Sequence, residues 1–175
     1  MIRLQADVPE LSLEGVKGGQ VRRYTLSELR GRWVIVLFYP ADFTFICPTE
    51  VLGFDRRLEE LDALGAGVLG VSVDDVDSHR QWAEELGGVR FPLLSDPDRA
   101  TSRAYGVLNE EDGRAYRATV IVSPEGKLAY FVASPMNVGR SVEETVRVLR
   151  ALQTGRLCPA EWKPGTPTGS PELRY

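Results

Sequence analysis

Cysteine and histidine are scarce in this chain of 175 residues, which contains two cysteines, Cys47 and Cys158, and one histidine, His79. A structural zinc site needs about four Cys or His ligands, so three such residues exclude one. No Cys-x-x-Cys motif is present, which excludes a dithiol within one loop. In a reducing cytoplasm, cysteines this far apart in sequence stay as thiols unless a disulfide forms transiently in catalysis.

Long apolar runs and a strong charge of one sign are also missing. No stretch approaches the roughly 18 apolar residues of a membrane span, and "MIRLQADVPE" lacks a signal-peptide pattern, so we expect a cytoplasmic protein. The net charge of −4 gives no support to a nucleic-acid or anionic-membrane partner. Length and a hydrophobic content of 43% suit one globular domain.

Strand-like and helix-like patterns alternate along the chain, which predicts an α/β fold with a central mixed sheet flanked by helices. A tail rich in proline and glycine follows Cys158, and we expect it to be an extended, mobile arm. The predicted elements are a hairpin turning at Gly18-Gly19, a buried strand 33–39, a helix 47–65, a strand 66–73, a helix 77–86 capped by Asp77 or Ser78, a short helix 96–106, a hairpin 117–134 and a helix 142–155 capped by Ser141.

Cys47 follows the apolar strand in "FYPADFTFICPTE" and starts the predicted helix. The unpaired N–H groups and the dipole of a helix N-terminus stabilise an anion, so this placement favours a nucleophilic thiolate. A buried, inert thiol is the alternative. Pro40 and Pro48 restrain the flanking backbone, and Thr44 places a hydroxyl three residues before the thiol.

Two stretches together resemble a known family. "PADFTFICPTE" is similar to the peroxidatic loop of the peroxiredoxins, with the pattern Pro-x-x-x-Thr-x-x-Cys. "LCPAEWKPG" and the helix "NVGRSVEETVRVLRALQ" before it resemble the resolving-cysteine segment of typical two-cysteine peroxiredoxins of the bacterial alkyl hydroperoxide reductase C type. The similarity runs from about Leu4 to Gly165. It implies a thioredoxin-like fold with an N-terminal hairpin extension and a C-terminal arm.

The resemblance also implies residue roles. Cys47 matches the peroxidatic nucleophile, and Cys158 matches the resolving cysteine. Thr44 and Pro40 would shape the peroxide pocket, and Arg117, which begins "RATVIV", would stabilise the thiolate and the leaving oxygen.

Glu50 in Cys-Pro-Thr-Glu and Arg140 in "VGRS" match a supporting carboxylate–arginine network. Trp162 would anchor the arm in the reduced state. Residues 1–157 would form the peroxidase domain and 158–175 the arm, within a single domain.

The implied reaction reduces hydrogen peroxide or an organic hydroperoxide through a Cys47 sulfenic acid. Cys158 of a partner subunit then forms a disulfide with Cys47, and an external dithiol protein reduces it. That reductant is a flavoprotein disulfide reductase, thioredoxin or another dithiol carrier. The resemblance implies an antiparallel homodimer, which can assemble into a ring of five dimers, and no metal, haem or flavin in the chain.

Two other functions use features of the same sequence. A cysteine hydrolase would use Cys47 with His79, but no acyl-transfer motif accompanies the thiol. A chaperone or redox-sensor assembly is a second role that the ring-forming tendency of the family allows.

Several other residues are expected to have structural roles. His79 is expected as a solvated residue in the first turn of a helix, and "DDVD" (74–77) as a solvated loop and helix cap that binds no metal. Trp82 and Tyr105 are expected in the core or at an interface.

Family members that excess peroxide inactivates easily carry a Gly-Gly-Leu-Gly loop and a C-terminal Tyr-Phe helix. Here the corresponding region is "GGVRFPLL", and the sequence ends in "SPELRY". We therefore expect an enzyme that resists overoxidation.

Overall fold

The computed structural model describes residues 2–170 and 172. It forms two compact units, one ending at Arg140 and the other beginning at Ser141. In the final stretch "SPELRY", residues 171 and 173–175 lie outside the described part. Among the described residues, no helix is long and apolar enough to cross a membrane.

A seven-stranded sheet forms the centre of the first unit, because its strands carry the β-branched and aromatic residues that favour pleated structure. The β3–β4 and β4–β5 pairs are parallel and the others antiparallel, which confirms the predicted mixed sheet. In sheet order the strands are β2 (Gln20–Thr25), β1 (Ser12–Lys17), β5 (Leu93–Ser95), β4 (Ala66–Ser72), β3 (Trp33–Phe38), β8 (Arg117–Val122) and β9 (Leu128–Ser134).

The predicted hairpins are both present. Gly18 and Gly19 join β1 to β2, and both have a positive φ, which glycine adopts without strain. The β8–β9 hairpin occupies the predicted stretch 117–134. The short strands β5, β6 (Leu108–Asn109) and β7 (Arg114–Ala115) were not predicted, because two- or three-residue strands carry no periodic pattern.

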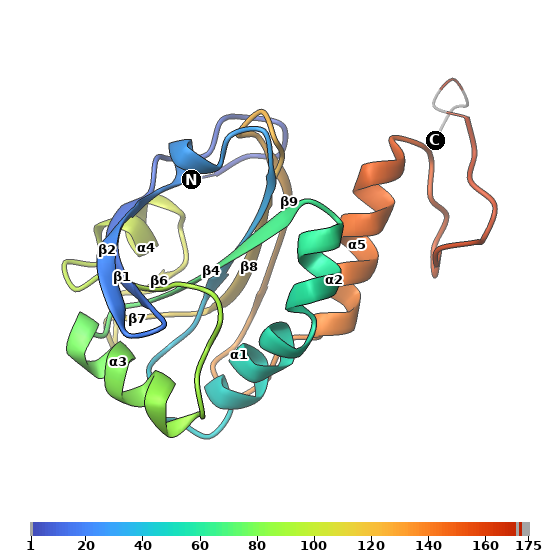
Figure 1. Ribbon diagram of the computed structural model, residues 1–175. Coiled ribbons are helices and arrows are strands. Elements are labelled where there is room, and N and C mark those ends of the chain that lie inside the picture. Colours follow the sequence, from blue (N-terminus) through green and yellow to red (C-terminus); the bar gives the residue numbers. More distant parts are fainter. Residues whose placement is uncertain (1, 171, 173–175) are drawn as a thin grey trace. The chain divides into compact units, whose positions relative to one another are not determined.

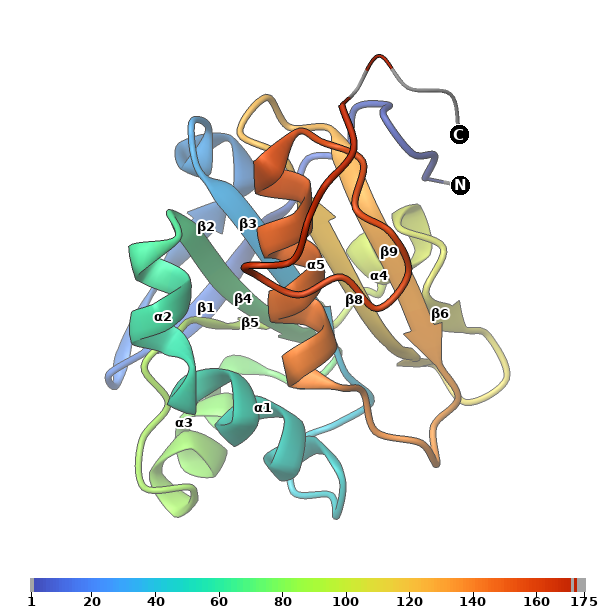
Figure 2. The same cartoon turned by 90° about the vertical axis from the view of Figure 1, so that its right-hand side faces the viewer.

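Helices of the first unit lie on both faces of the sheet, with α1 (Cys47–Arg56) and α2 (Leu58–Ala63) on one face and α4 (Ala100–Ala104) on the other (Figures 1 and 2). The predicted single helix 47–65 is therefore interrupted, at Arg57. The cap predicted for α3 (Val76–Glu85) was wrong, because the Asp75 side chain caps this helix. Asp75 Oδ1 accepts a hydrogen bond from the Ser78 amide at 2.8 Å. A 3-10 turn, η1 (Leu26–Leu29), follows β2.

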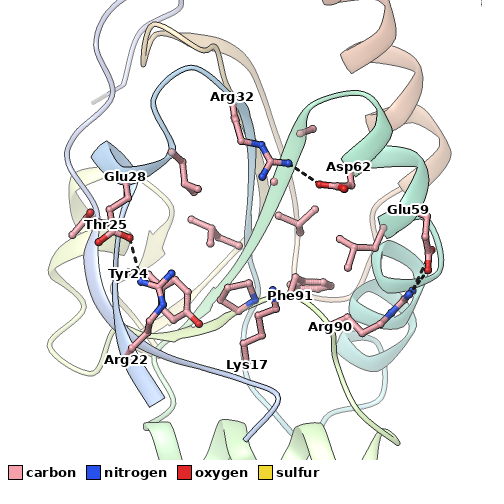
Figure 3. Close-up of a pocket in the computed structure, with 17 residues that line it drawn as sticks. Lys17, Arg22, Tyr24, Thr25, Glu28, Arg32, Glu59, Asp62, Arg90 and Phe91 are labelled. Carbon is pink, nitrogen blue, oxygen red and sulfur yellow. Dashed lines mark hydrogen bonds and ion pairs between the residues drawn. The ribbon is translucent and has the colours of Figure 1, made fainter. Parts of the chain in front are cut away.

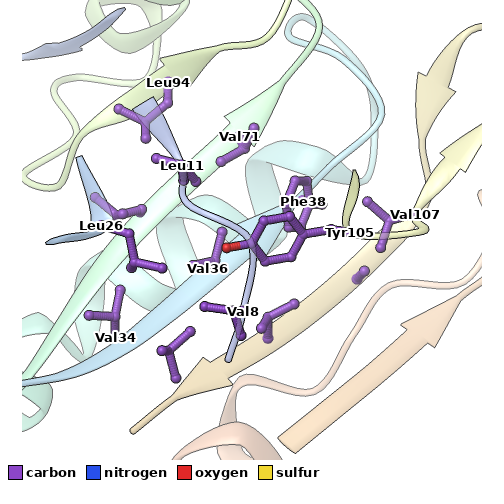
Figure 4. Packing of buried hydrophobic residues seen from close by; sticks show 14 of the residues in the cluster. Val8, Leu11, Leu26, Val34, Val36, Phe38, Val71, Leu94, Tyr105 and Val107 are labelled. Carbon is purple, nitrogen blue, oxygen red and sulfur yellow. The ribbon is translucent and has the colours of Figure 1, made fainter. Parts of the chain in front are cut away.

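An apolar cluster fills the space beside β3, β4 and β8 (Figure 4). Phe38 and Tyr105 pack with ring centroids 5.2 Å apart at its centre. Trp82 is buried in α3, so both aromatics predicted for the core, Trp82 and Tyr105, are inside. The cluster also contains valines and leucines from the central sheet and from the segment before β1, including Val8, Leu11, Val34, Val36, Val71 and Leu94.

The second unit consists of α5 (Val142–Thr154) and the segment after it. The Ser141 hydroxyl accepts a hydrogen bond from the Glu144 amide at 3.1 Å, as predicted. After α5 the chain folds back, and Leu157 and Gly169 exchange two backbone hydrogen bonds of 3.1 and 2.8 Å. The described tail is therefore a closed loop, not the extended arm that its composition indicated.

Candidate active site

The sheet register brings Cys47 and Arg117 together. β3 and β8 are antiparallel with Phe38 opposite Ala118, so the end of β3 lies beside the start of β8. Cys47 follows β3 as the first residue of α1 and is 0% exposed. Arg117, the first residue of β8, donates from Nη1 to the Cys47 Sγ atom at 3.2 Å. The predicted thiol–arginine pair is thus formed.

The first turn of α1 places the positive end of the helix dipole at the thiol. Pro48, the second helical residue, has no N–H to leave unpaired, and its fixed φ suits a helix start. The Thr49 and Glu50 amides of this turn donate to the Ile46 carbonyl, so it is the positive end of the helix dipole that favours an anion at the Cys47 position. An anionic sulfur here is stabilised by both the backbone and the guanidinium.

Glu50 connects two buried arginines, as the predicted network requires. Its Oε2 atom accepts from Arg117 Nη1 at 2.9 Å, and its Oε1 atom accepts from Arg140 Nε at 3.0 Å. The Arg140 amide also donates to Oε1 at 2.9 Å. A further Arg117 donor, Nε, binds the Met136 carbonyl at 2.8 Å. The Arg117 guanidinium is therefore held by three partners before any substrate arrives.

Arg140 holds the ends of β3 and β8 against this network. Its guanidinium donates to the carbonyls of Phe38 and Ala118, the latter at 2.7 Å. Burial lowers the pKa of Arg140 below its ordinary value, and the adjacent Glu50 carboxylate opposes that shift. Two guanidinium groups beside one carboxylate leave one positive charge, which a thiolate at Cys47 would balance.

Thr44 and Pro40 occupy the loop between β3 and α1. The Thr44 hydroxyl donates to the Ala41 carbonyl at 3.0 Å, which leaves its oxygen lone pairs able to accept a hydroperoxide O–H. Pro40 is buried and Thr44 is half-buried. Because the donor of Thr44 is already used, its hydroxyl is suited to act as a hydrogen-bond acceptor in the site.

Cys158 belongs to the second unit and follows the C-terminus of α5. Both cysteines are free thiols. The Cys158 sulfur lies 3.4 Å from the Thr154 hydroxyl and 3.8 Å from the Ala151 carbonyl. In the same unit Trp162 is buried and donates from Nε1 to the Thr166 carbonyl at 3.1 Å, so it is no exposed tail residue.

The expectation for His79 was wrong. Its side chain is 0% exposed, and its Nδ1 atom lies 2.8 Å from Asp42 Oδ2. The Nε2 atom is 3.0 Å from the Leu94 carbonyl. Arg117, not His79, contacts Cys47, so the geometry does not favour the hydrolase. The isolated histidine in a polar stretch gave no signal of burial, because its partners come from separate loops and strands.

The loop "DDVD" is a helix cap with exposed residues, as expected, because Asp75 caps α3 and both Asp75 and Asp77 are exposed. Its first residue differs from the expectation: the half-buried Asp74 carboxylate accepts from the Asp42 amide at 2.9 Å and from Ser72 at 2.6 Å. The loop therefore has a structural role, and its first carboxylate binds the peroxidatic loop directly.

A cavity of about 510 Å³ lies away from these residues, between β2, β4 and α2 (Figure 3). Its floor is apolar and includes Phe91, and its rim is charged. Arg32 pairs with Asp62 at 2.8 Å across part of this rim. None of the proposed site residues lines the cavity, so it has no part in the chemistry at Cys47.

A buried cysteine at a helix N-terminus, paired with an arginine on a thioredoxin-like mixed sheet, defines the class of thiol peroxidases called peroxiredoxins. The AhpC/TSA family model matches residues 4–131, and the chain belongs to this family. It is 39% identical over 178 residues to the thioredoxin peroxidase of Fasciola hepatica, with 96% of this chain and 92% of that one covered.

Solved structures similar to this chain are also peroxiredoxins and AhpC proteins. The reduced 2-Cys peroxiredoxin of Plasmodium vivax is 31% identical with a TM-score of 0.90, covering 94% of this chain and 91% of that one. The AhpC of Enterococcus faecalis is 36% identical with a TM-score of 0.86, covering 91% and 100%. The chain is therefore an oxidoreductase that reduces peroxides with a thiol.

Proposed function

We propose that Cys47 is the peroxidatic nucleophile of this thiol peroxidase, and that it acts on hydrogen peroxide and organic hydroperoxides. The observation that carries the proposal is the 3.2 Å contact from Arg117 Nη1 to the buried Cys47 Sγ atom, with Glu50 orienting the guanidinium. A structural thiol needs no such charged partner in the protein interior.

The chemistry follows from these contacts. The Cys47 thiolate attacks one peroxide oxygen, the O–O bond breaks, and the products are a sulfenic acid and an alcohol or water. Arg117 stabilises the negative charge that develops on the leaving oxygen. Thr44 accepts the hydroperoxide O–H and aligns the O–O bond with the sulfur. Pro40 keeps bulk water from this side of the pocket.

Cys158 then resolves the sulfenic acid. Its sulfur bonds to the Cys47 sulfur and water leaves, and an external dithiol reduces the disulfide through a mixed-disulfide intermediate. We propose a cytoplasmic dithiol protein as reductant, either a flavoprotein disulfide reductase or a thioredoxin-like carrier. Residues 158–175 would act as the arm that delivers Cys158 to the partner subunit.

The two edges of the sheet support a homodimer built on β9. The β2 edge carries Arg22 and Arg23, and such charges discourage pairing with another chain. The β9 edge is apolar, with Phe131 and Val132 partly exposed at 37% and 38%. Two β9 strands related by a two-fold axis would pair in antiparallel fashion and give two equivalent sites.

A further contact between dimers is supported by the peroxidatic loop. Phe45 is 93% exposed, and Phe43 is exposed beside it. Exposed aromatic residues of this kind favour a protein partner. We propose that they join dimers into a ring of five.

The test compares two single variants in a stopped-flow assay with hydrogen peroxide. Cys47→Ser should abolish both the fast oxidation of the protein and turnover with a dithiol. Cys158→Ser should keep the fast oxidation and lose only turnover, because the sulfenic acid still forms. Fast oxidation that survives in Cys47→Ser would show that Cys47 is not the nucleophile.

A further inference from the structure

A buried polar group beside the site has no role in the reaction just described. His79 lies in the first turn of α3, and its side chain is fully buried. One ring nitrogen pairs with Asp42 at 2.8 Å and the other with the Leu94 carbonyl at 3.0 Å. Asp42 is in the peroxidatic loop, five residues before Cys47. A buried pair of this kind requires good geometry to offset the loss of hydration.

Asp42 is fixed from several directions. Tyr39 donates to its Oδ1 atom at 2.8 Å, and Ser78 donates to its Oδ2 atom at 2.8 Å, beside His79. Burial, followed by the charge of Asp42, raises the pKa of Tyr39 well above its usual value, so the hydroxyl stays protonated and remains a donor. The Asp42 amide is bound by Asp74 at 2.9 Å.

A strained residue follows Asp42 in the loop. Phe43 has a positive φ, in the left-handed region that is unfavourable for an aromatic residue. Thr44 donates to the Ala41 carbonyl within the same loop, and Phe45 extends outward. The contacts that tie this loop to α3 and to Asp74 are therefore made at Asp42, directly before its strained residue.

We propose that His79 is a positioning residue of the peroxidatic site. Through Asp42 it fixes the start of the loop, so that Thr44 and Cys47 return to the reactive geometry each time the first turn of α1 has unwound to form the disulfide. This inference rests on the role proposed above for Cys47. It predicts that weakening the Asp42 contacts slows the reaction of Cys47 with peroxide, although none of these groups touches the substrate.

Two serine variants provide a matched test. Ser78→Ala removes a hydroxyl that donates to Asp42, and Ser102→Ala removes a buried hydroxyl that donates to Asp96 Oδ2 at 2.7 Å. No hydrogen bond described for Asp96 or Ser102 reaches residues 39–46. Both variants delete one bond to a buried carboxylate, so both should lower thermal stability.

The rate constant for oxidation of Cys47 by hydrogen peroxide distinguishes the two serine variants. We expect Ser78→Ala to lower this second-order constant by about 3- to 10-fold, and Ser102→Ala to change it by less than about twofold. Equal effects of the two variants, or no effect of Ser78→Ala, would overturn the proposal.

Two conservative variants of His79 test whether its contact with Asp42 or its contact with the Leu94 carbonyl matters for the reaction. The amide nitrogen of asparagine can occupy the place of Nδ1, and that of glutamine reaches toward the place of Nε2. His79→Asn should therefore keep the bond to Asp42 and react at least about threefold faster than His79→Gln. The reverse order would contradict a role through Asp42. If either variant does not fold, the comparison of Ser78→Ala with Ser102→Ala still tests the proposal.

The unmodified protein is measured first in the same assay. If it shows no fast oxidation at Cys47, the proposed function itself fails. If it reacts quickly and the serine variants behave alike, only the positioning role of His79 fails.

Discussion

At the scale of single residues, the site depends on donors whose direction is fixed. Arg117 uses Nη1 for both Cys47 and Glu50, and Nε for the Met136 carbonyl. A lysine has the same charge but one nitrogen on a flexible chain, so it cannot make these bonds together. The guanidinium therefore supplies orientation as well as charge.

We predict that Arg117→Lys lowers the second-order rate constant for peroxide by about 10- to 100-fold, equivalent to about 1.4 to 2.8 kcal/mol of transition-state stabilisation. Stopped-flow oxidation of the reduced variant measures it. Arg114→Lys, at an exposed position in β7, is the control and should react like the parent. A parent-like rate in Arg117→Lys would mean that charge alone is sufficient.

Motif residues were predictable from the sequence because the motif fixes their spacing along one chain segment. Cys47, Thr44 and Glu50 fall within "PADFTFICPTE", and the structure places all three in one loop and helix turn. His79 and Asp42 were missed as a pair, because their contact depends on how the loop after β3 meets α3. Periodicity does not report such a contact between a loop and a separate helix.

At the scale of secondary-structure elements, long strands and amphipathic helices were predicted well and connections poorly. The run 33–39 was continuous and apolar, and it forms the central strand β3. The break at Arg57 between α1 and α2 has no proline or glycine beside it to mark it. The sequence also contained no sign of the hydrogen-bond partner of Tyr105. The Tyr105 hydroxyl, just after α4, donates to the Pro9 carbonyl at 2.7 Å.

Tyr105 makes the fold sensitive to high pH. Burial, and then the nearby Glu10 charge, raises the pKa of Tyr105 above that of a tyrosine in the unfolded chain. The folded state therefore keeps a proton that the unfolded state loses. This stabilising contribution is complete below about pH 10 and is lost as the pH rises further.

We predict that the free energy of unfolding falls above about pH 10, and that Tyr105→Phe makes this fall shallower by up to about 1.4 kcal/mol per pH unit. At neutral pH the variant should be less stable by about 1 kcal/mol, because it lacks the bond to Pro9. Urea unfolding at several pH values measures both. An unchanged slope in the variant would contradict the assignment.

The edge strand β9 gives a second prediction at this scale. Val132→Glu would place like charges close together across a two-fold axis, so the reduced protein should shift toward monomer. Val21→Glu, on the opposite edge strand β2 and similarly exposed, is the control and should leave assembly unchanged. Sedimentation velocity measures the masses. A stable dimer in Val132→Glu would place the interface elsewhere.

At the scale of the whole molecule, the proposed mechanism makes the balance between disulfide formation and overoxidation depend on how easily the first turn of α1 unwinds. The connection from α3 to β5 is the short stretch that includes Gly87 and Gly88. It lacks the Gly-Gly-Leu-Gly loop of the family members that excess peroxide inactivates, so unwinding should be easier. We predict that several equivalents of peroxide give disulfide, with little sulfinic acid at Cys47.

Intact mass after repeated turnover checks this, since a sulfinic acid adds two oxygen atoms to the thiol. Ser78→Ala is informative here as well, because a less firmly held loop should not increase the sulfinic product. Rapid accumulation of sulfinic acid at a small peroxide excess would show that the loop difference does not control resolution.

The central claim is a peroxidatic Cys47 that is resolved by Cys158 of a partner subunit, and one measurement tests it most directly. One equivalent of hydrogen peroxide is added to the reduced protein, an alkylating agent stops the reaction, and intact masses are taken without reductant. A covalent dimer with Cys47–Cys158 links is the predicted result. A monomer with an internal bridge would contradict the subunit arrangement, and two alkylated thiols on every chain would contradict the peroxidatic role of Cys47.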